Sequence, residues 1–260
     1  MILAFNTSTP QFSIALMKEE GTIMSEYYMA SGSKNFRRFM PGIDFLLATS
    51  EVDTKDIKAL IVATGPGSFT GLRVGLSEAK GMAQGLQIPI IGVSSLEAMA
   101  AQLPFVRQPV CAIIDSRKGE VFAALFSWGD DQRMIRTQQD ICLRIKDLPS
   151  VIEKPSLFLG NDFNTQGHLI REMLGPKAEL APAYLWNLKA SAVGTLGLNR
   201  FIAQDFDDLQ ELGPTYMRPP DIRPNPFAPN SEKPDSNHPG EKRDPNPPSN
   251  LCIKTEINRL

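Results

Sequence analysis

The chain has 260 residues, of which 42% are hydrophobic and 22% are charged, the balance expected of a globular protein with one large or two smaller α/β units. It contains no stretch of about 18 apolar residues, which argues against a membrane-spanning helix and a membrane role. A formal net charge of −2 gives no overall attraction to nucleic acid, so a partner would hold most of any bound nucleic acid. Apolar residues follow Met1 directly, without the basic stretch of a secretory signal, and we therefore expect a cytoplasmic protein.

The cysteines and histidines are too few and too far apart for a metal centre. Cys111, Cys142 and Cys252 are an odd number at wide spacing, which argues against a disulfide framework or a CxxC site. The two histidines are His168 and His238, and the second lies in a proline-rich stretch. A Ser-His-Asp triad would have to use His168, so the sequence predicts no metal site and gives no support to a triad.

In the first half of the chain, apolar residues first alternate as they do in strands and then recur at the spacing of a helix. Apolar residues alternate over 12–16, whereas those of 36–47 recur three and four apart. Turn-forming residues from Asn6 to Pro10 separate the first two strands. The predicted order is strands at 2–5, 12–16 and 22–29, a helix at 36–47, a strand at 57–63, a helix at 72–86, a strand at 88–93 and a helix from about 95.

The second half resembles a weaker copy of the first. Its predicted elements are a strand at 111–114, a turn at 115–119, extended segments at 120–128 and 134–143, a strand at 156–159, and helices near 165–174 and 188–203. Alternating helices and strands predict an α/β fold with helix-covered sheets. We expect an N-terminal subdomain at 1–105, a C-terminal subdomain at 106–218, and a disordered tail at 219–260, where ten of the 21 prolines fall.

A glycine-rich loop between the strand at 57–63 and the next helix is the most distinctive string. Its residues are Gly65, Pro66, Gly67, Ser68, Phe69, Thr70, Gly71 and Arg73. The loop matches neither GxxxxGK[ST] nor GxGxxG with an acidic partner. Two interpretations stay open: backbone N–H groups that bind phosphate at a helix N-terminus, or a tight structural connection in which Thr70 caps the helix and Gly71 and Gly75 lie on a close-packed face.

The chain offers no intact catalytic group, and we predict no catalytic residue. The pairs Glu19–Glu20 and Asp207–Asp208 have the context of solvated turns, and Asp115 and Glu120 flank a hairpin. The apolar stripes at 36–47 and 72–86 either bind another helix or cover the chain's own sheet, and periodicity alone does not separate these two roles.

Five segments in the same order resemble the TsaB (YeaZ) family over about residues 1–220. They are ILAFNTST, GPGSFTGLRVGLSEAKGMAQGL, IPIIGVSSLEAMA, IIDSRKGEVF and PTYMRPPD. The resemblance implies a duplicated ribonuclease-H-like fold of the actin, Hsp70 and sugar-kinase superfamily, with mixed sheets in two subdomains and a degenerate nucleotide cleft. Asn6 stands where most relatives carry Asp, which removes a carboxylate suited to a metal–phosphate group.

The family resemblance also implies a function without catalysis by this chain. Members dimerise with TsaD, which forms threonylcarbamoyladenosine at adenosine 37 of ANN-decoding tRNAs, and the small ATPase TsaE joins the complex. We therefore expect a TsaD-like partner, a TsaE-like partner, tRNA bound mainly through the complex, and no cofactor, with weak nucleotide binding and a homodimer left open. An independent ATP-dependent phosphotransferase is the alternative. The family's helical interface maps onto Phe36, Phe39, Met40, Ile43, Leu72, Leu76, Ala79 and Ala83.

Overall fold

The computed structural model describes residues 1–29 and 37–218. Phe36, predicted to contact a partner, and the tail at 219–260, predicted to be disordered, lie outside the described residues. Within them, no helix has both the length and the apolar character needed to cross a bilayer.

A five-stranded mixed sheet forms the core of the N-terminal lobe. Its strands are β1 (Ile2–Asn6), β2 (Phe12–Met17), β3 (Ile23–Met29), β4 (Ala59–Gly65) and β5 (Ile90–Ser94), in the order β3-β2-β1-β4-β5. Strands β1, β2 and β3 are antiparallel neighbours, whereas β4 is parallel to β1 and β5 to β4. Every residue of β1, β2 and β4 is buried, since helices cover both faces of the sheet.

The C-terminal lobe repeats this arrangement. Its strands are β6 (Val110–Asp115), β7 (Glu120–Trp128), β8 (Met134–Arg136), β9 (Ile141–Arg144), β10 (Ser156–Leu159) and β11 (Ala178–Leu180). The order is β11-β10-β6-β7-β8, with β9 also paired to β7. Strands β8, β7 and β6 are again antiparallel neighbours. Strand β10 is parallel to β6, and β11 is parallel to β10. The common strand order confirms the duplicated ribonuclease-H-like fold.

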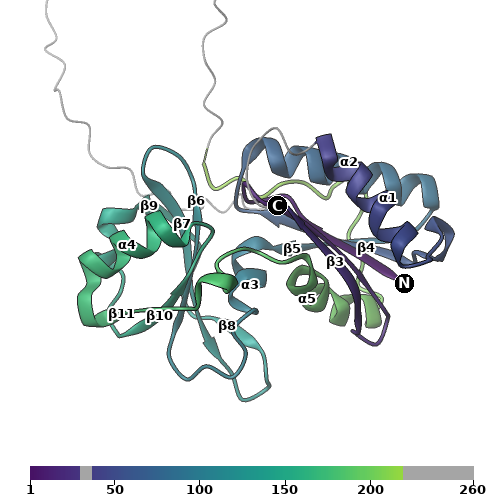
Figure 1. The fold of residues 1–260 in the computed structure, drawn as a ribbon. Coiled ribbons are helices and arrows are strands. Elements are labelled where there is room, and N and C mark those ends of the chain that lie inside the picture. Colours follow the sequence, from purple (N-terminus) through teal and green to yellow (C-terminus); the bar gives the residue numbers. More distant parts are fainter. Residues whose placement is uncertain (30–36, 219–260) are drawn as a thin grey trace, which may run out of the picture.

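Helices cover the sheets and fill the junction between the lobes (Figure 1). Helices α1 (Phe39–Thr49) and α2 (Phe69–Leu86) lie on one face of the first sheet, and α5 (Ala190–Ile202) lies on the other. Helix α3 (Ser95–Ala100) contacts both sheets, and α4 (Phe163–Leu174) packs on β10 and β11. Short 3₁₀ helices span Thr54–Asp56, Ile145–Ser150, Gly175–Lys177 and Ala183–Leu185.

The end of the described chain returns to the N-terminal lobe, so the predicted boundary that assigned 106–218 to one subdomain is wrong. Helix α5 packs on β1, β2 and β4 because Gly194 and Gly197 let its backbone approach Ala4 and Ile61 closely. Residues 204–218, here called the C-terminal strap, continue across the same lobe. Asp207 N–H donates to the Ile90 carbonyl at 3.0 Å, and Thr215 N–H donates to the Thr64 carbonyl at 2.7 Å.

Two further expectations differ from the structure. The extended segment predicted at 134–143 is two short strands, β8 and β9, because both pair with different parts of the long strand β7. Strand β11 was not predicted, since three residues are too few to show a period.

The side chains predicted to contact a partner mostly face the chain's own sheet. Phe39, Ile43, Leu72, Leu76, Ala79 and Ala83 are all buried, and Met40 is half-buried against the same core. Their apolar period reflects packing on the chain's own sheet, so a partner that contacts α1 or α2 meets mainly other residues of these helices.

Candidate functional site

A cleft with a volume of about 370 Å³ lies between the two lobes. Three loops and the C-terminal strap line it, each at the end of an element described above. The lining residues include Ser8 and Pro10 after β1, Gly67, Ser68 and Phe69 before α2, Asp115, Ser116 and Arg117 after β6, and Thr215, Tyr216, Met217 and Arg218 of the strap. The glycine-rich loop and the hairpin turn are thus brought together, as expected for a cleft of this fold.

Asn6, at the end of β1, is fully buried and uses its amide to hold the local structure. Its Oδ1 accepts hydrogen bonds from the Ser8 N–H at 2.8 Å and the Ser8 Oγ at 2.6 Å. Its Nδ2 donates to Thr9 Oγ1 at 3.1 Å and to the Leu188 carbonyl at 3.2 Å. The amide therefore fastens the first turn to the segment before α5, and it does not face the cleft as a free ligand.

Two backbone donors of the glycine-rich loop are bonded within the chain, one to the turn after β1 and one to the loop itself. The Ser68 N–H donates to the Ser8 carbonyl at 2.6 Å, and the Gly71 N–H donates to Ser68 Oγ at 3.2 Å. Ser68 is therefore the N-cap of α2, and the prediction that Thr70 caps the helix is wrong. These bonds favour the structural interpretation of the loop, and phosphate binding stays a prediction.

Close backbone approach explains the glycines of this region. A Cβ at Gly67 would overlap the Ser8 carbonyl, and one at Gly75 would overlap the Thr7 side chain. Gly65 has φ of +116°, and a Cβ there would lie 2.9 Å from the Thr215 carbonyl oxygen. Only glycine lets the loop, the β1 turn and the strap meet at these distances.

We expect Gly67→Ala to lower the free energy of unfolding by about 1–3 kcal/mol, because the obstacle is backbone that cannot rotate away. The matched control is Gly85→Ala, on the exposed side of α2 with open space around its Cβ. It should stabilise the chain by about 0.5–1 kcal/mol. Urea denaturation of both variants measures the difference, and equal stabilities would contradict the packing argument.

The strap adds an aromatic cluster at the cleft mouth. The Tyr216 ring stacks on Phe69 with centroids 5.2 Å apart. Arg73 lies over the Phe69 ring at 4.0 Å and donates from Nε to the Tyr216 hydroxyl at 3.0 Å. Tyr216 was not among the predicted site residues, although it belongs to the PTYMRPPD segment that carries part of the resemblance.

The other wall of the cleft carries the acidic residues. Asp115 is exposed, yet the surrounding protein still desolvates its carboxyl and, with the nearby charge of Asp162, raises its pKa. Glu120 pairs with Arg218 of the strap at 2.5 Å, a contact that spans the two lobes. Within residues 1–29 and 37–218, no three His, Cys, Asp or Glu side chains are grouped as a metal site would require.

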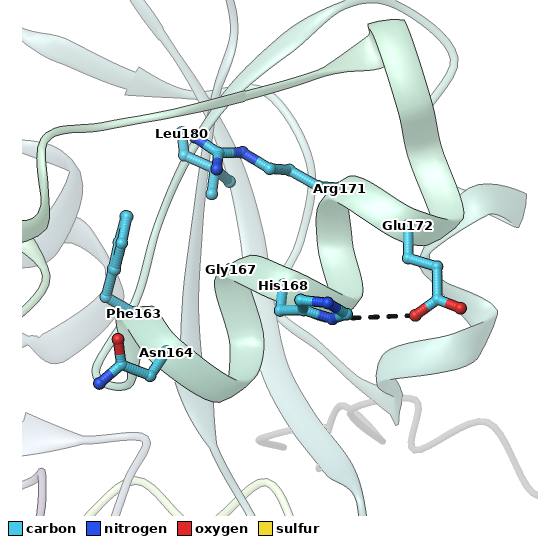
Figure 2. Close-up of a pocket in the computed structure, with 7 residues that line it drawn as sticks. All are labelled: Phe163, Asn164, Gly167, His168, Arg171, Glu172 and Leu180. Atoms are coloured by element: carbon cyan, nitrogen blue, oxygen red, sulfur yellow. Dashed lines mark ion pairs between the residues drawn. The ribbon is translucent and has the colours of Figure 1, made fainter.

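A second, shallow hollow of about 480 Å³ lies over α4 and β11 (Figure 2). Its residues include Phe163, Asn164, His168, Arg171 and Glu172. Figure 2 shows His168 and Glu172 on neighbouring turns of α4, and the two side chains pair at 3.9 Å. No Ser, Thr or Cys lines this hollow, so it brings no nucleophile to His168.

The two described cysteines are buried structural thiols. Cys111 and Cys142 are both buried. Burial raises the pKa of the Cys111 thiol to about 12, so the reactive thiolate is scarce at neutral pH.

The outward side of α1 and α2, here called the outer helical face, is open. On α1 it includes Phe45, whose side chain is 59% exposed, and Pro41. On α2 it includes Ser77, Gly81 and Gly85, and a Cβ at either glycine would meet nothing within 4 Å. The interface residues implied by the family resemblance belong to the apolar stripe, whereas the residues that interrupt the stripe are the exposed ones.

The chain is similar to proteins named for tRNA modification. A protein-family model described as TsaD, tRNA N6-adenosine threonylcarbamoyltransferase, matches residues 33–221. The tRNA threonylcarbamoyladenosine biosynthesis protein TsaB of Bacillus subtilis (strain 168) is 32% identical over 219 residues, which cover 84% of this chain and 93% of that relative. Its Escherichia coli (strain K12) namesake is 39% identical over 51% of this chain and 55% of that protein.

The fold comparison agrees. The structure of YeaZ from Pseudomonas aeruginosa aligns with a TM-score of 0.68 and 24% identity, covering 83% of this chain and 98% of that one. Because the Bacillus relative aligns over nearly its whole length, the chain carries a TsaD-type domain and belongs to the TsaB (YeaZ) family.

Proposed function

We propose that this chain is a non-catalytic subunit in the formation of threonylcarbamoyladenosine in tRNA. The observation that carries the proposal is the near full-length similarity to a protein named for threonylcarbamoyladenosine biosynthesis. In this proposal the chain dimerises with a TsaD-like catalytic subunit, which modifies adenosine 37 of ANN-decoding tRNAs. A TsaE-like ATPase joins the complex, and tRNA is held mainly by the partners.

The chemistry of the cleft supports a non-catalytic role. Asn6 occupies the position of a would-be metal-binding carboxylate, and its amide is committed to Ser8, Thr9 and Leu188. Two amides at the start of α2 are likewise bonded within the chain, that of Ser68 to the Ser8 carbonyl and that of Gly71 to Ser68 Oγ.

The outer helical face is the surface that fits a helical partner. Ser77 and Gly81 leave room for another helix to approach α2 closely, and Phe45 of α1 supplies an exposed aromatic anchor over the edge strand β3. In contrast, the predicted contact at Leu72 is unavailable because its side chain is fully buried.

We expect Phe45→Asp and Gly81→Arg to abolish copurification with the TsaD-like chain of the same organism and to reduce threonylcarbamoyladenosine in reconstituted reactions by at least about tenfold. Affinity pull-down measures the complex, and mass spectrometry of nucleosides from digested tRNA measures the product. Both changes are at exposed positions, so circular dichroism should show an intact fold.

The matched control is Phe105→Asp, the same change at a 73% exposed phenylalanine between α3 and β6. It should leave binding and product unchanged. If wild-type chain does not bind the TsaD-like protein and modification proceeds without it, the proposal fails. If Phe45→Asp instead disperses a homodimer and leaves the heterodimer intact, the outer helical face serves self-association.

An ATP-dependent phosphotransferase is the alternative, motivated by the 370 Å³ cleft between the lobes. It requires the purified chain to hydrolyse ATP or phosphorylate a small molecule by itself. Turnover that disappears in Asn6→Ala, with the fold intact, would favour this alternative over the proposed function.

A further inference from the structure

A groove of about 290 Å³ runs between α2 and the C-terminal strap, beside the outer helical face. We call it the strap groove. Its apolar lining comes from Leu76 of α2 and from Leu212 and Pro214 of the strap. Arg73, Ser77 and Lys80 of α2 and Tyr216 of the strap complete the lining.

The strap wall of this groove is firmly held. Asp207 Oδ2 accepts from the Gly92 N–H at 2.7 Å and from Arg200 at 3.1 Å, and the Arg200 guanidinium also pairs with Asp205 at 2.7 Å. At the other end, Thr215 is bonded to β4 through its N–H. Because both ends are fixed in the free chain, a ligand of the groove would lose little affinity to ordering the strap.

Within the described residues, the two cations of the groove form no salt bridge, although Lys80 is close enough to Asp208 for its charge to help lower the pKa of that carboxyl, after the backbone N–H groups of Glu211 and Gln210. Arg73 donates to the neutral Tyr216 hydroxyl, and Lys80 donates from Nζ to the Gln210 carbonyl at 3.2 Å. In the described part of the chain, neither lies within 4.0 Å of a carboxylate oxygen. Other arginines of the chain, such as Arg200 and Arg218, do pair with carboxylates. Arg73 and Lys80 are seven residues apart, about 10 Å along the helix, so they mark the two ends of the apolar lining.

The groove is continuous with the outer helical face. Ser77 lines it, and Gly81 lies one helical turn further along α2. A partner helix seated on Gly81 therefore reaches the groove without a gap in the surface.

We infer that the strap groove binds an acidic segment of the TsaD-like partner, in which a carboxylate meets Lys80 and a neighbouring apolar side chain packs on Leu212 and Pro214. This inference rests on the proposed function. Peptide fits better than RNA because the lining between the two cations is apolar, and a run of phosphates has no apolar group to pack there.

Charge reversal at Lys80 tests the inference in the complex with the TsaD-like chain. Lys80→Glu should weaken binding by about tenfold at low salt and less at high salt, because an interfacial charge pair is screened by salt. Lys80→Gln should have an intermediate effect. The matched control, Lys154→Glu, reverses an exposed charge on the other lobe and should leave binding unchanged.

Zero-length carbodiimide coupling gives a second measurement, since it joins an amine to a carboxylate that it touches. In the wild-type complex it should link Lys80 to an Asp or Glu of the partner, as identified by peptide mass spectrometry. Absence of this link together with unchanged binding of Lys80→Glu would overturn the inference and leave the proposed function standing. Loss of tRNA binding in Lys80→Glu, with partner binding intact, would also overturn it in favour of an RNA site. Failure of the wild-type chain to bind the partner would overturn both.

Discussion

Replacing Phe39 by alanine is expected to lower the free energy of unfolding by about 3–5 kcal/mol, the cost typical of removing a fully buried phenylalanine. Only 1% of Phe39 is exposed. Its ring packs edge-on against Phe5, with centroids 5.0 Å apart, and against Phe12 at 5.6 Å. The substitution therefore removes the contact between α1 and the central strands of the first sheet. Urea or thermal denaturation measures the loss.

Phe45 is the matched control for Phe39, since it is the same residue type on the same helix. Its side chain is 59% exposed and touches only the sheet edge, with its ring 6.2 Å from that of Tyr27. Phe45→Ala should change the free energy of unfolding by less than about 1 kcal/mol and should weaken binding of the TsaD-like partner. A stability loss at Phe45 as large as that at Phe39 would show that α1 is oriented differently from the structure.

Asn6→Ala is expected to lower the free energy of unfolding by about 2–4 kcal/mol, because it leaves the buried Ser8 N–H and the Ser8 hydroxyl without their acceptor, while the Thr9 hydroxyl keeps its bond to the Gln11 carbonyl. The Leu188 carbonyl would keep one bond, from Ser13 Oγ at 3.1 Å. Chemical denaturation at neutral pH checks the size of the effect. A change below about 0.5 kcal/mol would mean that the Asn6 network does not stabilise the fold.

Asn6→Asp separates the acceptor role of this side chain from its donor role. A carboxylate would still accept from Ser8, but it would face the Leu188 carbonyl with no proton to donate. Burial should raise the pKa of the introduced carboxyl, so the folded chain would bind a proton more tightly than the unfolded chain. The loss of unfolding free energy relative to wild type should therefore grow as the pH rises above about 4, the ordinary pKa of Asp. It should level off above the pKa of this carboxyl in the folded chain. A deficit that is equal at pH 4 and pH 8 would contradict this assignment.

The sequence by itself determined the repeated α/β order and the family. Strong periods placed most strands and helices, because a buried strand or an amphipathic helix must repeat its apolar residues at fixed intervals. The glycine-rich loop was placed between β4 and α2 for the same local reason, since Gly65 and Gly67 break both periods.

Only the tertiary structure shows which faces of α1 and α2 are exposed to solvent. Periodicity shows that Phe39 and Leu76 share an apolar stripe with their neighbours, but whether a stripe covers the chain's own sheet or a partner depends on contacts between residues distant in sequence. Ser68 rather than Thr70 caps α2 because the loop is bonded to Ser8, some 60 residues earlier.

Local sequence patterns likewise did not predict the position of the C-terminal strap. The strap is held along the N-terminal lobe by hydrogen bonds from Asp207 to β5 and from Thr215 to β4. The residues around Asp207 and Thr215 show no helix or strand period in the sequence. Local sequence therefore specified the elements and the family, whereas only long-range hydrogen bonds and burial decided the cleft, the strap groove and the outer helical face.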